Sequence, residues 1–131
     1  MTLLPLLRLL RQGGPKLLAI APLVLPLLKD NKNREALLHA ARDLADRSPE
    51  RRLRGRVSGT EAVAQGMADE AGTPQERELA LGWVRRAHNL GRSLDMPVTT
   101  RSARRAKRDG IARQVDALQS EMEAHLGTDE G

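Results

Sequence analysis

The sequence contains no cysteine, phenylalanine or tyrosine, and Trp83 is its only aromatic residue. Without cysteine the chain can form no disulfide bond, which fits a reducing compartment. The lack of phenylalanine and tyrosine argues against binding of single-stranded nucleic acid by base stacking. Residues that favour strands are scarce, whereas Ala, Leu, Arg and Glu are abundant, and this composition predicts an all-α fold.

Sequence motifs for catalysis are also missing. The chain has no glycine-rich phosphate loop, no HExxH and no paired CxxC. Its histidines, His39, His88 and His125, lie far apart, and each is expected to be exposed beside charged residues. No pair of carboxylates stands in apolar surroundings, so nothing predicts an acid or base with a raised pKa. We therefore expect a protein that is not an enzyme and that has no cofactor or metal site.

Bulky apolar residues are concentrated at the N-terminus. About 15 of roughly 35 Leu, Ile, Val, Met and Trp residues lie within residues 1–29. The rest of the chain is so poor in these residues that it is marginal as an independent compact domain. Residues 1–29 are therefore either the missing part of a core or a surface that meets another molecule.

Residues 1–29 predict a Leu- and Pro-rich helical hairpin flanked by basic residues. A first helix over 2–11 ends at QGGP, and an apolar run over 17–28 follows. This run is shorter than the ~20 residues that span a bilayer, and Pro22 and Pro26 disfavour a straight helix. No small-residue cleavage pattern follows, so we expect a retained segment facing the cytoplasm rather than a secretory signal.

This hairpin is expected to lie in a membrane interface, with its leucines in the acyl region and its cations at the headgroups. The alternative is a soluble helical bundle in which the hairpin completes the core. Under the first interpretation the residues in contact with lipid are Leu3, Leu6, Leu7, Arg8, Leu10, Arg11, Lys16, Leu17, Ile20, Leu23, Leu27 and Lys29.

The chain after the hairpin predicts three to four helices, in a loosely packed bundle or an extended helical hairpin. An Ala-rich helix within 30–48 begins at a cap in DNKN and ends before Ser48-Pro49. Residues 49–59 are rich in arginine and bounded by Pro and Gly, so we expect a basic linker. A short, weak helix should follow from Ser58, which forms a capping-box pattern with Glu61, to about residue 71.

Two amphipathic helices are predicted within residues 60–126. The sequence TPQE at 73–76 is a strong start signal for a helix over 74–95, which contains Trp83 as a core residue. A second helix over 102–126 ends in two heptads of coiled-coil spacing, and residues 127–131 should be a disordered tail. The residues expected to pair these helices, with each other or with a partner protein, are Leu79, Trp83, Ala87, Leu90, Leu94, Ile111, Val115, Leu118 and Met122.

The formal net charge of +5 is unevenly distributed. Residues 1–29 contain no acid, two further basic clusters follow at 51–56 and 101–108, and residues 114–131 are acidic. Positive patches favour an anionic partner, either a membrane surface or nucleic acid. The residues expected to contact it are Arg51, Arg52, Arg54, Arg56, Arg101, Arg104, Arg105, Lys107 and Arg108.

Together these patterns predict a non-catalytic helical adaptor or interaction module, peripheral to the cytoplasmic face of a membrane. One alternative is a soluble module for oligomerisation, including homo-oligomerisation, or for binding a protein partner. The other is non-specific nucleic-acid binding through 101–108. In that cluster no Asn is present to recognise adenine, so only phosphate contacts are expected.

Overall fold

The computed structural model describes Leu7 and residues 30–130, with side-chain positions as far as residue 126. Within that part the chain forms four α-helices and no strand, which confirms the all-α prediction. The helices are α3 (Asn31–Leu44), α4 (Pro49–Glu70), α5 (Pro74–Asp95) and α6 (Arg101–Glu130). Apart from Leu7, the predicted hairpin over 1–29 lies outside the described residues.

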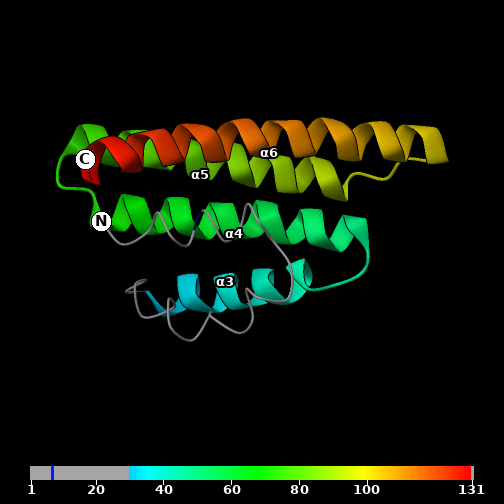
Figure 1. Cartoon of the computed structure of the whole chain (residues 1–131), viewed down its shortest axis with the longest axis horizontal. Coiled ribbons are helices and arrows are strands. Elements are labelled where there is room, and N and C mark those ends of the chain that lie inside the picture. The colour runs from blue at the N-terminus through cyan, green and yellow to red at the C-terminus, as the bar shows by residue number, and fades with distance from the viewer. Residues whose placement is uncertain (1–6, 8–29, 131) are drawn as a thin grey trace.

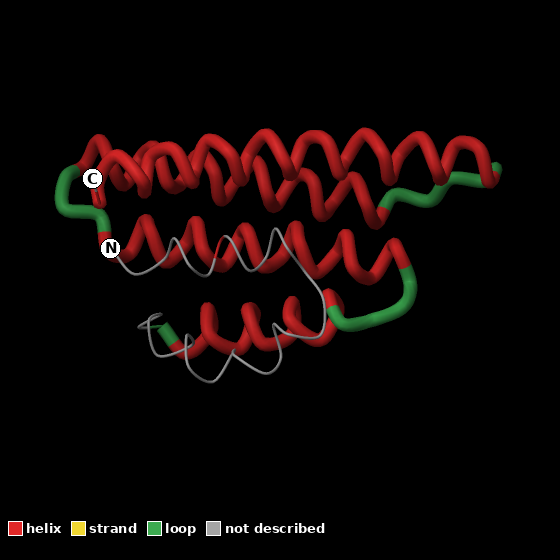
Figure 2. The backbone as a smooth tube through the Cα atoms, viewed as in Figure 1, coloured by secondary structure: helices red, strands yellow, loops and turns green. Residues whose placement is uncertain are grey.

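Consecutive helices run in opposite directions, with connections at alternating ends of the molecule (Figure 2). Helix α4 is central, because it packs against α3, α5 and α6, and α5 also packs against α6 (Figure 1). The alternating direction brings the starts of α4 and α6 to one end of the molecule and the ends of both helices to the other.

Each described helix begins at a side-chain cap that the sequence supplies. Such a cap accepts a hydrogen bond from one of the first-turn amides, which have no partner inside the helix. Thr73 and Pro74 define the start of α5, and the predicted bounds of 74–95 are confirmed. The caps, with the distance from the side-chain oxygen to the amide nitrogen, are Asp30 (2.7 Å), Ser48 (3.4 Å), Thr73 (3.1 Å) and Thr100 (3.0 Å).

The predicted basic linker at 49–59 is wrong, because these residues form the first half of α4. Ser48 and Pro49 end the preceding helix, but they also provide the N-cap and the first position of α4. Ser58 does not start a helix; its hydroxyl donates to the carbonyl oxygen of Gly55 at 3.4 Å.

The glycines of this segment, which suggest a break in the sequence, allow close packing between helices. A Cβ atom on Gly55 would lie 2.6 Å from the carbonyl oxygen of Ala40 and 2.9 Å from the amide nitrogen of Leu44. Only glycine therefore permits this approach of α3 to α4. Glycine lowers intrinsic helix stability by about 1 kcal/mol relative to alanine, so here tertiary packing outweighs local propensity.

Two helix ends also differ from the prediction. Helix α3 ends at Leu44 instead of continuing to 47, and Asp46 accepts a hydrogen bond from the amide of Ser48 at 2.8 Å in the turn that follows. This hydrogen bond, together with nearby Arg51, holds the pKa of Asp46 below its usual value. At the other end of the chain, α6 continues through residues 127–130, so the disordered tail predicted there is wrong.

The core combines small residues of α4 with larger side chains of α5 and α6. Trp83 lies in it with 4% of its surface exposed. Leu79, which was expected on the buried face of α5, is 44% exposed, whereas Leu81 packs against the core. Leu7 is fully buried in the same cluster, so the structure places it away from any lipid-facing surface.

The burial of Leu7 predicts that this residue stabilises the fold in the absence of any membrane. Replacing Leu7 with Ala should lower the free energy of unfolding by about 2–5 kcal/mol, as for other fully buried leucines. The matched control is Leu79→Ala at the exposed position, which should change it by no more than about 0.5 kcal/mol. Urea unfolding followed by circular dichroism measures both, and equal effects would contradict a core role for Leu7.

The contact at Gly55 predicts opposite effects of the same substitution at two helical glycines. Gly55→Ala should destabilise the protein by roughly 1–3 kcal/mol, because the added methyl group meets backbone atoms of α3. A Cβ atom on Gly110 would meet nothing within 4 Å, so Gly110→Ala should stabilise it by about 0.5–1 kcal/mol. The close-packing interpretation fails if thermal melts of the two variants shift in the same direction.

Candidate functional site

The first turns of α6 project beyond the end of α5, as Figure 1 shows. Farther along α6, the buried residues Ile111, Val115, Leu118 and Met122 recur at spacings of four and three. The same spacing continues backwards to Arg108, Arg104 and Arg101. The projecting segment therefore extends the core-facing side of α6 with arginine where the core has apolar residues. We call residues 101–108 the basic overhang.

The arginines of the basic overhang are not neutralised. Arg101, Arg104 and Arg105 are exposed and Arg108 is half-buried. None of them forms an ion pair with another described residue. The first turn of α6 also contains no acid, so these cations lie at the positive end of the helix dipole. The like charges of these arginines repel one another, and an anionic partner would relieve this repulsion.

Lys107 belongs to the same segment and has a structural role, while its contact with an anionic partner stays a prediction. Its ammonium group donates to the carbonyl oxygens of Leu94 at 2.9 Å and Met96 at 2.8 Å. These carbonyls lie at the end of α5, where a positive charge is favourable. The contact also fixes the connection between α5 and α6 against the overhang. In that connection the side chain of Met96 is 65% exposed.

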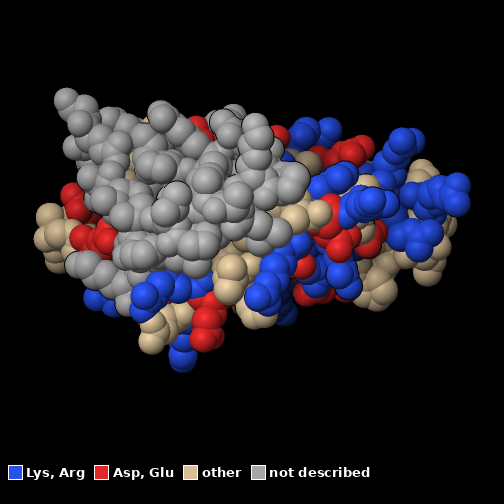
Figure 3. Space-filling model, turned by 60° about the horizontal axis from the view of Figure 1, so that its bottom comes forward, with Lys and Arg blue, Asp and Glu red and all other residues tan. Residues whose placement is uncertain are grey.

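The basic cluster at 51–56 is largely neutralised within the protein. Arg51 pairs with Asp46 at 3.4 Å and Arg54 pairs with Asp95 at 2.6 Å. Only Arg52 is exposed without an ion pair to a described residue. Because α4 and α6 begin at the same end, this cluster and the overhang make that end rich in arginine and lysine (Figure 3).

Acidic residues gather at the opposite end of the molecule. They lie near the end of α4, the start of α5 and the last turns of α6, and they are Asp69, Glu70, Glu76, Glu78, Glu121 and Glu123. The described part of the chain is thus polarised along the helix axes. Such a distribution orients a protein as it approaches a charged surface.

Arg56 is part of a polar network between α4 and α6, and its contact with an anionic partner stays a prediction. Its side chain is 19% exposed, pairs with Asp116 and donates to Gln119 Oε1 at 2.9 Å. The amide of Gln119 donates to the hydroxyl of Thr60 at 2.9 Å, and that hydroxyl donates to the carbonyl oxygen of Arg56 at 2.7 Å. Thr60 and Gln119 are fully buried, so their polar groups satisfy one another away from water.

This network was not predicted from the sequence, although Gln119 carries a signal for it. Gln119 follows Val115 by four residues and precedes Met122 by three, so it falls on the apolar side of α6. A polar residue at such a position needs a buried partner, and Thr60 on α4 provides it.

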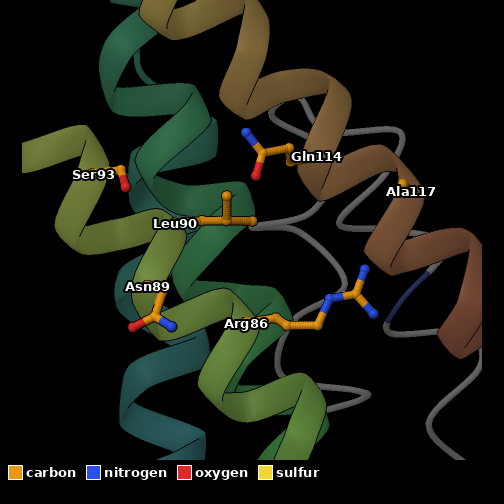
Figure 4. Close-up of a pocket in the computed structure, with 6 residues that line it drawn as sticks. All are labelled: Arg86, Asn89, Leu90, Ser93, Gln114 and Ala117. Atoms are coloured by element: carbon orange, nitrogen blue, oxygen red, sulfur yellow. The ribbon is translucent and has the colours of Figure 1, made fainter.

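A groove of about 330 Å³ lies between α5 and α6 (Figure 4). Arg86 extends from α5 toward α6, and its guanidinium pairs with Glu121, which also accepts the indole N–H of Trp83 at 3.3 Å. The described residues that line the groove include no carboxylate and no histidine. They are Arg86, Asn89, Leu90, Ser93, Gln114 and Ala117.

The described residues also form neither a metal site nor a membrane-spanning helix. They bring together no group of three or more His, Asp and Glu side chains suited to a metal ion. No helix among them is both long and apolar enough to cross a bilayer. His39 and His88 are exposed, but the prediction that His125 is exposed is wrong. Its half-buried ring meets Trp83 in a T-shaped contact, with 5.4 Å between the ring centroids.

The polar network predicts a stability loss when one member is removed. Thr60→Val removes the acceptor of the Gln119 amide and should destabilise the protein by about 1–3 kcal/mol, because a buried donor is left without a partner. Ser58→Ala, in the same helix at a half-buried site, should change stability by less than about 0.5 kcal/mol. Chemical denaturation of both variants tests this, and a neutral Thr60→Val would mean that the network does not stabilise the native state.

Antiparallel helical bundles carry many unrelated functions, so the fold by itself assigns none. Other exposed arginines, such as Arg52, Arg77 and Arg85, also lack ion pairs to described residues, but those of the basic overhang are clustered in the first turns of one helix. Comparison with known proteins adds no assignment, since no family model, curated protein or solved structure matches the chain.

Proposed function

We propose that this chain is a non-catalytic helical adaptor that binds peripherally to the cytoplasmic face of a membrane, with its basic end toward anionic lipid. The observation that carries the proposal is the basic overhang, whose four arginines lack ion-pair partners among the described residues and project beyond the bundle. The cationic end faces the bilayer in this arrangement, and the acidic end stays free for a protein partner.

Two contributions hold the protein at the surface. Each arginine close to anionic lipid adds about 1 kcal/mol of attraction, and this attraction is screened by salt. Met96 adds an apolar contact, because its exposed side chain can enter the interface between headgroups and acyl chains. Lys107 keeps Met96 and the overhang together, so both reach the same surface.

Met96 also favours a membrane over nucleic acid as the partner. A duplex offers phosphate groups to the arginines, but its backbone surface offers no apolar phase for an exposed methionine. A membrane interface accepts both kinds of side chain.

The residues proposed to contact lipid differ from those predicted from the sequence alone. The overhang now provides the main attachment, because Leu7 contributes to the core and much of the cluster at 51–56 is paired internally. Lipid contact by the other residues selected within 1–29 stays a prediction.

Flotation with vesicles that contain phosphatidylglycerol tests the proposal. The wild-type protein should float with these vesicles at low salt and be released as salt increases. Arg104→Gln combined with Arg105→Gln should weaken binding roughly 10–30-fold, since two favourable charges are lost. Met96→Ser by itself should also weaken vesicle binding, but without changing its dependence on salt.

The matched control removes two charges elsewhere. Arg77→Gln combined with Arg85→Gln changes the net charge equally, at exposed residues of α5 without ion pairs to described residues. This variant should float nearly as well as the wild type. The proposal is overturned if the wild type stays unbound, if both double variants lose binding equally, or if duplex DNA binds more tightly than the vesicles at the same salt concentration.

A further inference from the structure

We infer that the basic overhang selects lipids whose headgroup is a phosphate monoester, such as phosphatidic acid, over lipids whose phosphate is a diester. The inference rests on the proposed membrane function and adds the headgroup chemistry. It follows from a hollow of about 600 Å³ on the overhang, lined by Arg101, Ser102, Arg105 and Arg108.

The three arginines line the same hollow because of their spacing on one helix. Positions 101, 105 and 108 are four and three residues apart, which places them on one side of α6. Ser102 adds a hydroxyl at the edge of this side, within the first turn of the helix. No acidic residue is among the described residues that line the hollow, and none of its arginines has an ion-pair partner in the described part of the chain. Three unpaired arginines thus border one hollow.

A phosphate monoester matches this donor set better than a diester does. Each guanidinium is a planar fork that binds two oxygens at once. A monoester has three terminal oxygens and loses a second proton near neutral pH, whereas a diester has two such oxygens and a single charge. The surrounding cations and the positive end of the α6 dipole favour the doubly charged form. The serine hydroxyl can donate a further hydrogen bond to it.

Replacing arginine with lysine separates recognition of a phosphate monoester from simple charge attraction. Lysine carries the same charge as arginine but presents a point charge without the bidentate fork. Replacing Arg101, Arg105 and Arg108 with Lys therefore keeps the attraction to any anionic surface and removes the geometry that favours a monoester. The wild-type protein and this triple variant should bind diester vesicles alike and differ on monoester vesicles.

The test uses the full-length chain and two sets of phosphatidylcholine vesicles, one with phosphatidic acid and one with phosphatidylglycerol, adjusted to equal zeta potential. The wild-type protein should bind the phosphatidic acid vesicles roughly tenfold more tightly, the change expected for one or two additional charge-assisted hydrogen bonds. The lysine variant should bind phosphatidylglycerol within about twofold of the wild type and show no preference between the two lipids. Circular dichroism checks that the variant keeps its helical content.

Failure of this inference differs from failure of the proposed function. Equal binding of the wild type to both vesicle types, or an unchanged preference in the lysine variant, overturns the headgroup selectivity and leaves membrane binding intact. A wild type that binds neither set overturns both proposals. Calorimetry with glycerol 3-phosphate tests whether the ligand is a lipid. If the protein binds this soluble monoester as tightly as it binds the phosphatidic acid vesicles, the assignment to lipid is overturned.

Discussion

The closeness of α3 and α4 at Gly55 is the constraint on which the rest of the fold depends. With a backbone oxygen 2.6 Å from the position of a Cβ atom, the two helices can pack this way only because the side chain is absent. Alanines and glycines are also prominent among the buried residues of α4, which packs against α5 and α6 as well. A chain with little bulky apolar material in residues 30–131 thereby obtains a core, since short side chains bring backbones together and make many contacts at short range.

Polar contacts then determine where α6 lies along this central helix. Apolar packing alone tolerates a shift of one turn, whereas the hydrogen bonds of Gln119 with Thr60 and Arg56 exist in one register only. Lys107 adds a second fixed point at the end of α5. In this register the first turns of α6 must extend past α5.

The sequence predicted those elements whose signals are local. Thr73, Pro74 and Glu76 define the start of α5 without help from other helices, and its bounds were correct. Helix α4 could not be predicted, because Gly55 and Gly59 disfavour a helix until the packing of α3 is known. At the candidate site, the sequence does not show which cations are paired within the protein. Arg56, Lys107 and the arginines of the overhang look alike in a charge count, and only their partners in three dimensions distinguish structural cations from free ones.

Arginine on the core-facing side of the overhang also bears on self-association. Apolar residues at positions 101, 104 and 108 would extend the seam of Ile111, Val115 and Leu118 and expose a coiled-coil surface to other copies of the chain. Arginine at these positions makes two such surfaces repel each other, since like charges would meet along the seam. Under the proposed function, the same residues attract an anionic surface. One set of side chains would then both disfavour homo-oligomerisation through α6 and hold the protein at a membrane. Such a role would account for arginines at the positive end of the helix dipole, where they lower the stability of the helix.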